Sequence, residues 1–369
     1  MPSGPNRKPD RAPTLADVGR VAGVSAVAAS AVLNSSRTSS RIAPKTRARI
    51  LAAAAQLGYR ANGAARALAK SRMNVIGVAV VVRGGDLDHY FLEVFNGVIE
   101  KAAATDQNAM VFTLHDWHAD VQRLPEFCDG RIDGMILVGP LFTPEHAALL
   151  PRHTPFVALH ANHDLPGVVN IESDEEIGAY NLVRYLVDQG HRRILHLAGH
   201  EHLLGAQRRL RGYRRALADC GIKSDDSLVV DTGYDLDDGR RAMRKWLAGA
   251  SRQPLPHAVF CVNDMVAVGC MDVLAENGFK VPDDISVAGF DDSLAARTTV
   301  PQLTSVRQQL RKMGAAAVDA LLAHIDHRKN PAVPVTWGPI VFPTEIVQRA
   351  SVLPPPSTSR RVPATIVAG

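Results

Sequence analysis

Two polar side chains that could bind a ligand follow apolar runs that are typical of buried strands. Asn263 comes after Ala258–Cys261, and Asp291 comes after Ile285–Gly289. In an open α/β sheet, ligands bind beyond the carboxyl ends of the strands. An amide and a carboxylate together can hydrogen-bond to vicinal hydroxyl groups. We therefore expect Asn263 and Asp291 to belong to a site for a small polar molecule.

Two further strand ends carry groups of the same kind. His160 follows the expected strand Phe156–Leu159, and Asp116 follows the expected strand Ala109–Leu114. Asp116 would supply a carboxylate to the site, and Trp117 beside it would supply a stacking face.

The remaining carboxylates do not form a recognised catalytic motif. Asp264 and Asp292 are better explained as caps of helix N-termini. The chain has no GxSxG elbow, phosphate-binding loop, HExxH motif or dinucleotide fingerprint. Asp291 and His160 could resemble an acid–base pair, but we expect no turnover of any substrate. We therefore expect that the protein is not an enzyme. The four cysteines lack zinc spacing and fit a reducing, cytoplasmic environment, so we expect no metal and no cofactor.

Charge is distributed very unevenly along the chain. Residues 1–72 hold 13 Lys and Arg against two acids, a net charge of +11, whereas the remainder carries −6. A basic end on an acidic body indicates a protein that binds a polyanion with that end. Residues 1–13 are interpreted as a disordered, solvated arm, and the basic residues beyond them lie on patterned helices.

A helix-turn-helix is predicted directly after this arm. Leu15–Ala22 has apolar residues at helical spacing, Gly23 interrupts the pattern, and Ser25 is a good N-cap for a second helix that ends near Leu33. A third helix is expected over Pro44–Leu57. The second helix of such a motif enters the major groove of DNA.

From Asn74 onward the pattern alternates between buried strands and helices. It predicts parallel sheets covered by helices, and the number of units favours two doubly wound lobes over residues 74–350. Besides the strands above, we expect strands at 75–82, 135–138, 194–198 and 228–230, and helices at 91–103, 121–128, 174–188, 205–218, 237–247 and 265–276. Residues 351–369 are Pro- and Ser-rich and are expected to be a disordered tail. No apolar run is long enough to span a membrane, and because the N-terminus lacks an apolar stretch we expect no export signal.

Several motifs in order give the chain a strong resemblance to the lactose-repressor (LacI/GalR) family of bacterial transcription regulators. The resemblance runs from about Thr14 to Arg349 and includes TLADVGRVAGVS, TRARILAAAAQLGYRANGAARAL, NVIGVAV, GRIDGMIL, LVDQGHRRILHLAG, RRLRGYRRAL, VFCVNDMVAVGCMDVLAENGFKVPDDISVAGFDD and PTEIVQR. It implies an all-α helix-turn-helix DNA-binding head at 14–61, a hinge helix and linker at 62–73, and an α/β core like the periplasmic binding proteins.

The resemblance implies a set of DNA-binding residues in the head. Ala26, Val27, Ser30 and Ala31 match the positions that touch bases, and Thr14, Ser25 and Asn34 flank them. The family commonly has Arg where this chain has Ala31, so a bidentate guanine contact is missing. For Val27 and Ala31, core packing and contact with thymine methyl groups remain equally open.

The segment before the third helix is about three residues longer than is common in the family. It carries Arg37 and Arg41, and Lys45 follows. We expect phosphate contacts from these residues, because most protein–DNA hydrogen bonds go to the backbone. The alternative is that Arg37 or Arg41 reads a base that the second helix no longer reads.

The hinge is too short to be helical alone and is expected to fold on DNA. In it Asn62 would cap the helix, Arg66 would lie by the phosphates, and Leu68 would wedge into the minor groove.

The resemblance also implies the effector site. Arg209 matches the family arginine that reaches the ligand, whereas Arg208 and Arg211 are interpreted as solvated helix charges. Tyr90 and Phe91 match aromatic residues at the cleft edge, although Phe91 could equally begin the core face of its helix. With Asp116, His160, Asn263 and Asp291, these residues complete the predicted set.

Together these features predict a homodimeric repressor of a pseudo-palindromic double-stranded operator. A small effector in the cleft, most simply a sugar, would change its operator affinity, and a purine remains open as the effector. The alternative suggested by the core alone, a solute-binding protein for transport, has no use for residues 14–69.

Overall fold

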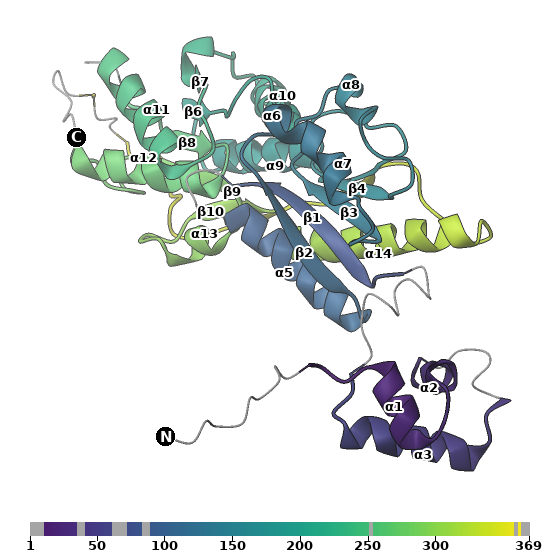
Figure 1. Ribbon diagram of the computed structural model, residues 1–369. Helices are drawn as coiled ribbons and strands as arrows, with labels where there is room; N and C mark the ends of the chain where they lie inside the picture. The colour runs from purple at the N-terminus through teal and green to yellow at the C-terminus, as the bar shows by residue number, and fades with distance from the viewer. Residues whose placement is uncertain are drawn as a thin grey trace, which may run out of the picture. The chain divides into compact units, whose positions relative to one another are not determined.

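The computed structural model describes residues 11–34, 41–60, 72–82, 89–250, 254–357 and 361–362. The chain divides into two units, Met1–Asn74 and Val75–Gly369, which are described separately (Figure 1).

The first unit is a bundle of three short helices. They are α1 (Leu15–Ala22), α2 (Ala26–Leu33) and α3 (Pro44–Gln56), within a residue of the predicted bounds. Gly23 ends α1 in the left-handed region, at φ 65°, which favours glycine. The axes of α1 and α2 therefore meet at 103°, within the range of a helix-turn-helix. Among the described residues no single helix is long and apolar enough to cross a membrane, and α1 with α2 reaches that length only across this bend.

The second unit contains two six-stranded sheets, each the centre of a lobe. The sheet of the N-terminal lobe has the order β11-β5-β4-β3-β1-β2, and all its pairs are parallel. Its strands are β1 (Val75–Val81), β2 (Asn108–Leu114), β3 (Gly134–Val138), β4 (Phe156–Leu159), β5 (Val169–Ser173) and β11 (Ile340–Phe342). Its helices are α5 (His89–Ala104), α6 (Trp117–Asp120), α7 (Leu124–Phe127), α8 (Pro144–Ala147) and α14 (Leu310–Lys329), with a 3-10 turn at Val121–Arg123.

The sheet of the C-terminal lobe has the order β12-β10-β9-β8-β6-β7, and only β10 and β12 are antiparallel. Its strands are β6 (Ile194–Leu197), β7 (Val229–Val230), β8 (Ala258–Cys261), β9 (Ser286–Asp291), β10 (Thr304–Arg307) and β12 (Glu345–Val347). Its helices are α9 (Glu175–Asp188), α10 (Leu204–Asp219), α11 (Leu236–Gly249), α12 (Asp264–Glu276) and α13 (Leu294–Thr298), with a 3-10 turn at Asp226–Leu228.

The chain crosses between the lobes three times, after β5, after β10 and after β11. These crossings are bonded to one another. The Asp174 N–H donates to the Phe342 carbonyl (2.9 Å), the Thr344 hydroxyl donates to the Asp174 carbonyl (3.2 Å), and Gln309 Nε2 donates to the Pro343 carbonyl (3.2 Å). The three segments therefore form one joint between the lobes.

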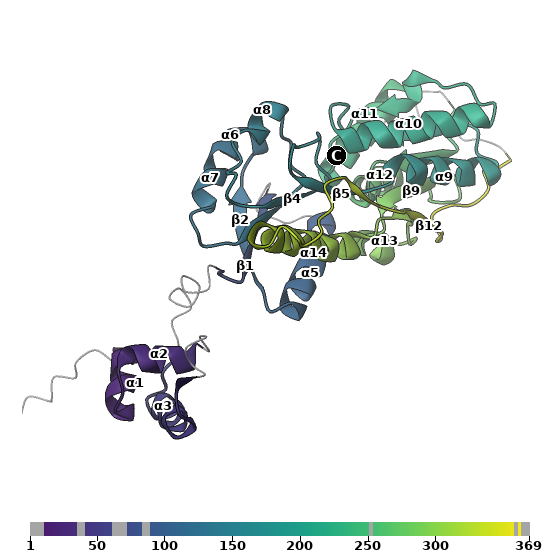
Figure 2. The same ribbon diagram turned by 90° about the vertical axis from the view of Figure 1, so that its right-hand side faces the viewer.

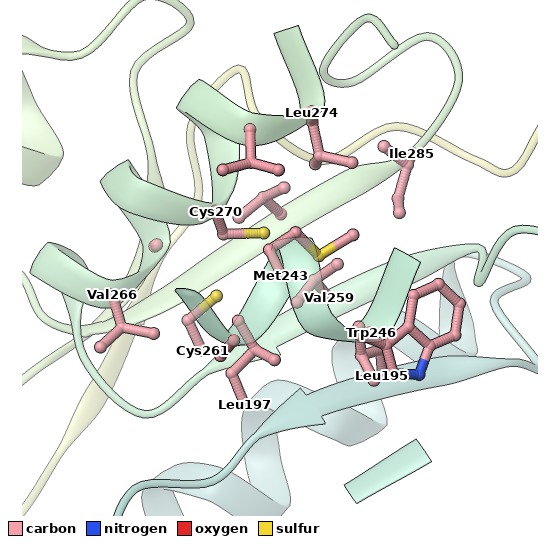
Figure 3. Close-up of a cluster of buried hydrophobic side chains, with 14 of the residues drawn as sticks. Leu195, Leu197, Met243, Trp246, Val259, Cys261, Val266, Cys270, Leu274 and Ile285 are labelled. Atoms are coloured by element: carbon pink, nitrogen blue, oxygen red, sulfur yellow. The ribbon is translucent and has the colours of Figure 1, made fainter. Parts of the chain in front are cut away.

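Helix packing in both lobes depends on close backbone contact and on buried apolar side chains. Figures 1 and 2 show α14 alongside α5, although more than 200 residues separate them in the chain. A Cβ on Gly97 would collide with the Arg311 carbonyl, and one on Gly314 would collide with the Val94 carbonyl. Figure 3 shows the core on one face of the C-terminal sheet, where Met243 and Trp246 of α11 pack with the strands and α12.

Several elements differ from expectation. The helix expected at 121–128 is broken into a 3-10 turn and α7, because Pro125 cannot continue an existing helix with full hydrogen bonding. Strand β5 and the elements from α13 to β12 were not predicted. The expected disorder of residues 351–369 is wrong for the first part of that segment. The Ser351 hydroxyl donates to the Val287 carbonyl (2.6 Å), and Val352 and Val362 are buried.

Candidate functional site: head and inter-lobe cluster

Thr14 fixes the start of the helix-turn-helix by a capping box. Its hydroxyl accepts from the Asp17 N–H (3.3 Å), while the Asp17 carboxylate accepts from the Thr14 N–H (3.0 Å) and hydroxyl (2.7 Å). These hydrogen bonds, with one from Arg20 (2.6 Å), hold the pKa of Asp17 well below its usual value. Thr14 is thus a structural cap.

The second helix presents a small, apolar outer face. The Ser25 hydroxyl caps α2 by accepting from the Ala28 N–H (3.2 Å). Val27 is 79% exposed, whereas Ala31 is only 9% exposed. Core packing therefore explains Ala31, while Val27 is left available to a partner. Ala26 is half-buried, and the half-buried Ser30 hydroxyl accepts from Asn34 Nδ2 (3.0 Å).

Exposed basic side chains lie on and just before α3. Arg41, Lys45 and Arg49 are exposed, and Arg47 is half-buried. Arg37, Asn62, Arg66 and Leu68, including the whole predicted hinge helix, lie outside the described residues. Their roles stay predictions.

In the core unit, His160 and Tyr90 meet at the edge of the N-terminal lobe. The Ser173 N–H donates to His160 Nε2 (3.2 Å), and His160 Nδ1 lies 2.6 Å from the Tyr90 hydroxyl. Burial lowers the pKa of His160 to about 4, so the ring is neutral near pH 7. Because Nε2 accepts a hydrogen bond, its single proton must lie on Nδ1 and point to Tyr90.

Across from this pair, Arg209 is buried in the C-terminal lobe. Its Nη2 donates to Glu175 Oε1 (2.7 Å), its Nη1 donates to the Val262 carbonyl, and its guanidinium lies 4.1 Å from the centre of the Phe290 ring. Burial alone would raise the pKa of Glu175, but the charge and hydrogen bond of Arg209, together with the other charges around the carboxylate, outweigh burial and keep that pKa low. Arg209 Nε is buried and has no hydrogen-bond partner among the described residues.

Arg208 is not the solvated charge that was predicted. It forms a two-pronged ion pair with Glu172, with Nη1 to Oε2 at 2.9 Å and Nη2 to Oε1 at 3.0 Å, and it lies 3.6 Å from Glu175. Arg211 is 53% exposed in its side chain and pairs with Glu176 on the surface, as expected of a solvated charge.

Asn263 and Asp291 occupy strand ends as predicted, but both are engaged within the protein. Asn263 Oδ1 caps α12 by accepting from the Val266 N–H (2.9 Å), and Nδ2 donates to the Tyr234 carbonyl (2.8 Å). Asp291 accepts from Gln308 Nε2 (2.6 Å). Asp291 nevertheless belongs to the surroundings of Arg209, because its charge acts on the Arg209 guanidinium and on the Tyr234 hydroxyl.

The two neighbouring aspartates are not helix caps, contrary to prediction. Buried Asp264 accepts from the Ser293 N–H (2.7 Å) and the Ser305 hydroxyl (2.6 Å), so it ties α12 to two other segments. Burial raises its pKa to about 6. Asp292 pairs with Arg307 (2.7 Å) and Arg349 (2.5 Å).

Two predicted effector residues have other roles. Phe91 is 3% exposed and packs in the core of the N-terminal lobe, stacked on Phe95. Asp116 caps α6 by accepting from the His118 and Ala119 N–H groups, and Trp117 is buried edge-on against Phe142. A polar residue at the end of a strand can therefore cap the following helix instead of binding a ligand.

We call His160, Tyr90, Glu172, Glu175, Arg208, Arg209, Tyr234 and Asp291 the inter-lobe cluster, since it joins side chains of both lobes. Glu172, Glu175 and Tyr234 were missed by the sequence analysis. Recognising Val169–Ser173 as a strand would have placed both glutamates at a strand end. A pocket of about 420 Å³ lies elsewhere, along β7 and α11, and none of these side chains lines it. No group of His, Cys, Asp and Glu suited to a metal occurs among the described residues.

Comparison with known proteins gives the same division of the chain. Residues 14–62 match a family model described as bacterial regulatory proteins of the lacI family, and residues 183–352 match a periplasmic binding protein-like domain. The HTH-type transcriptional regulator GalR of Escherichia coli (strain K12) is 33% identical over 93% of this chain and 96% of its own length. The HTH-type transcriptional repressor PurR of Vibrio campbellii (strain ATCC BAA-1116) is 31% identical over 86% of this chain and 93% of its own length.

Solved structures agree over the whole fold. A lac repressor dimer bound to operator and the anti-inducer ONPF has a TM-score of 0.79 and 27% identity, covering 93% of this chain and all of that one. A complex of the transcriptional regulator CelR with cellobiose has a TM-score of 0.68 and 27% identity, covering 92% of this chain and all of that one. The relatives named here are regulators and not enzymes, and the predicted fold class is confirmed. The chain belongs to the lacI family of bacterial regulatory proteins and is a DNA-binding regulator of transcription with an effector-binding core.

Proposed function

We propose that this regulator is a homodimeric repressor whose affinity for a pseudo-palindromic operator is controlled by an uncharged sugar bound at the inter-lobe cluster. The main observation in favour of an uncharged effector is that Arg208 and Arg209 are both already paired with carboxylates of the protein. Arg209 is bound by Glu175 and the Val262 carbonyl, and Arg208 is bound by Glu172.

The charge of the cluster argues against an anionic effector. Glu172, Glu175 and Asp291 supply three carboxylates against two guanidinium groups, and burial keeps His160 neutral. A phosphate or carboxylate entering here would meet repulsion from the third carboxylate. Hydroxyl groups, in contrast, can accept from Arg209 Nε and donate to carboxylates without adding charge. The relative whose structure holds cellobiose supports this class.

At the DNA end, we propose that exposed Val27 packs on base edges while Arg41, Lys45 and Arg49 contact phosphates. Two heads are needed because helix-turn-helix proteins bind two half-sites as dimers. A lac repressor structure contains such a dimer on operator.

The test is a DNA-binding titration with the full chain. A genomic fragment selected by the protein is titrated at several salt concentrations, with neutral mono- and disaccharides, sugar phosphates and nucleobases as added effectors. We expect strongly salt-dependent binding and a change in affinity of roughly 5–150-fold with a neutral sugar alone. A response only to phosphorylated sugars or nucleobases would overturn the effector class, and no preference for any fragment would overturn the function.

A paired variant tests the role of Arg209 in this response. Removing Arg209 alone would leave the Glu175 carboxylate buried without its partner, so Arg209→Met is combined with Glu175→Gln. We expect this double variant to bind DNA and to lose the sugar response. A normal response would exclude Arg209 from the effector site.

A further inference from the structure

We propose that Glu172, Arg208 and Asn162 form a latch that holds the two lobes together. Glu172 and Arg208 belong to the inter-lobe cluster, and the latch rests on the proposed function only in that an effector is taken to bind there.

The first part of the latch is the ion pair between Glu172 and Arg208. Glu172 lies on β5 of the N-terminal sheet, and Arg208 lies on α10, which packs on α9 in the C-terminal lobe. Both side chains are largely screened from solvent, with 11% and 22% exposed. Asn170 Nδ2 donates to Glu172 Oε2 (2.8 Å) and holds the carboxylate in place. Two-pronged arginine–carboxylate pairs are among the stronger polar contacts in proteins.

The second part is a helix cap supplied across the lobes. Helix α10 begins at Leu204, and Leu203 at its N-cap has no side-chain acceptor. Asn162, which follows β4 in the N-terminal lobe, fills this role, since its Oδ1 accepts from the Leu204 N–H (2.6 Å) and its Nδ2 donates to the His202 carbonyl (3.4 Å). Separation of the lobes would remove the cap and expose an unsatisfied N–H at the start of α10.

Other charges on α10 provide an internal contrast. Arg211 and Arg215 both pair with Glu176 of α9, so these pairs lie within the C-terminal lobe and cannot resist its separation from the other lobe. Arg208 alone on this helix reaches the N-terminal sheet through an ion pair in the described part of the chain. It also lies 3.6 Å from Glu175, the partner of Arg209. An effector that engages Glu175 or Arg209 therefore acts directly beside the latch.

The experiment compares Arg208→Met with the matched control Arg211→Met in the full chain, without effector or DNA. Amide hydrogen exchange is followed by mass spectrometry in peptides that cover the start of α10 and in peptides from its buried middle. We expect exchange at the Leu204 end to rise by roughly ten-fold in Arg208→Met, as expected when a charged hydrogen-bonded pair is lost and local opening is favoured. The middle of α10, and all of α10 in Arg211→Met, should keep the parent rate.

A second variant, Glu172→Gln, should reproduce the result while keeping the size of the side chain. Exchange at the Leu204 end that is equal in Arg208→Met, Glu172→Gln and Arg211→Met would overturn the latch. So would an increase spread over the whole C-terminal lobe, which would report general destabilisation. Because this measurement uses neither sugar nor DNA, its outcome is independent of the proposed effector and operator.

Discussion

At the ends of strands in this chain, the position of a polar residue does not determine whether its side chain is available to a ligand. Asn263 and Asp291 stand where the sequence predicts them, yet their polar atoms bind Val266, Tyr234 and Gln308. The pairing of Arg209 with Glu175 was not predictable, because the two residues are 34 positions apart and no local pattern relates them. Sequence reasoning placed Tyr90, His160, Arg209 and Asp291 in the site, but it missed Glu172, Glu175 and Tyr234 and did not show which charges neutralise one another.

Asp264 provides a prediction at this scale. Its folded-state pKa of about 6 lies above the unfolded value of 3.8, so its ionisation opposes folding. Asp264→Asn should therefore stabilise the protein near pH 7, by on the order of 2 kcal/mol. As the pH falls through this window the parent gains the proton, and the advantage of the variant should shrink.

Urea unfolding of parent and variant between about pH 7 and pH 4 measures this difference. An asparagine can still accept from the Ser293 N–H and donate to the Ser305 hydroxyl. A stability difference that does not vary with pH would contradict a raised pKa for Asp264.

At the scale of elements, the local signals of the head were read accurately, whereas the break at Pro125, helix α14 and the long-range strand pairings were not. The caps Thr14 and Ser25 and the break at Gly23 fix α1 and α2 with neighbouring residues, and their bounds were predicted within one residue. In contrast, β5 reads as a polar segment because Asn170 and Glu172 lie in it, and it is a strand only because β4 and β11 pair with it. Pairing between strands that are far apart in the sequence cannot be predicted from the local pattern of residues.

The crossing of α5 and α14 gives a prediction for these elements. Gly97→Ala would place a methyl group against the Arg311 carbonyl, and the two backbones would have to separate. We expect a loss of about 1–3 kcal/mol in unfolding free energy. The matched control is Gly249→Ala at the end of α11, where no atom lies within 4 Å of the added carbon. It should be neutral or stabilising by about 0.5–1 kcal/mol. Equal thermal shifts for the two variants would contradict the close crossing.

Over the whole molecule, burial of histidine links stability to pH. Burial lowers the pKa of His160, His191 and His196 to about 4. An unfolded chain takes up these protons from about pH 6.5, whereas the folded chain takes them up only near pH 4. The free energy of unfolding should therefore fall as the pH is lowered through this range. Asp264 has the opposite effect, because its raised pKa makes the folded chain bind up to one proton more than the unfolded chain.

His196→Phe isolates one of these protons. The ring would remain stacked between Tyr213 and Phe260, whose centres lie 5.0 and 4.3 Å away, without a titrating nitrogen. The slope of unfolding free energy against pH should decrease by up to one proton. An unchanged slope would mean that His196 is protonated in the folded protein.

The order of elements along the chain also bears on synthesis. Helix α14 and strand β11 complete the N-terminal lobe, yet they emerge from the ribosome only after nearly all of the C-terminal lobe. Until then the nascent N-terminal sheet lacks both an edge strand and one of the two helices that cover the apolar side chains of one face. A message cut short after residue 300 would thus yield a head, a C-terminal lobe without β10 and β12, and an N-terminal sheet with exposed apolar side chains. Such a product should be a substrate for chaperones and proteases.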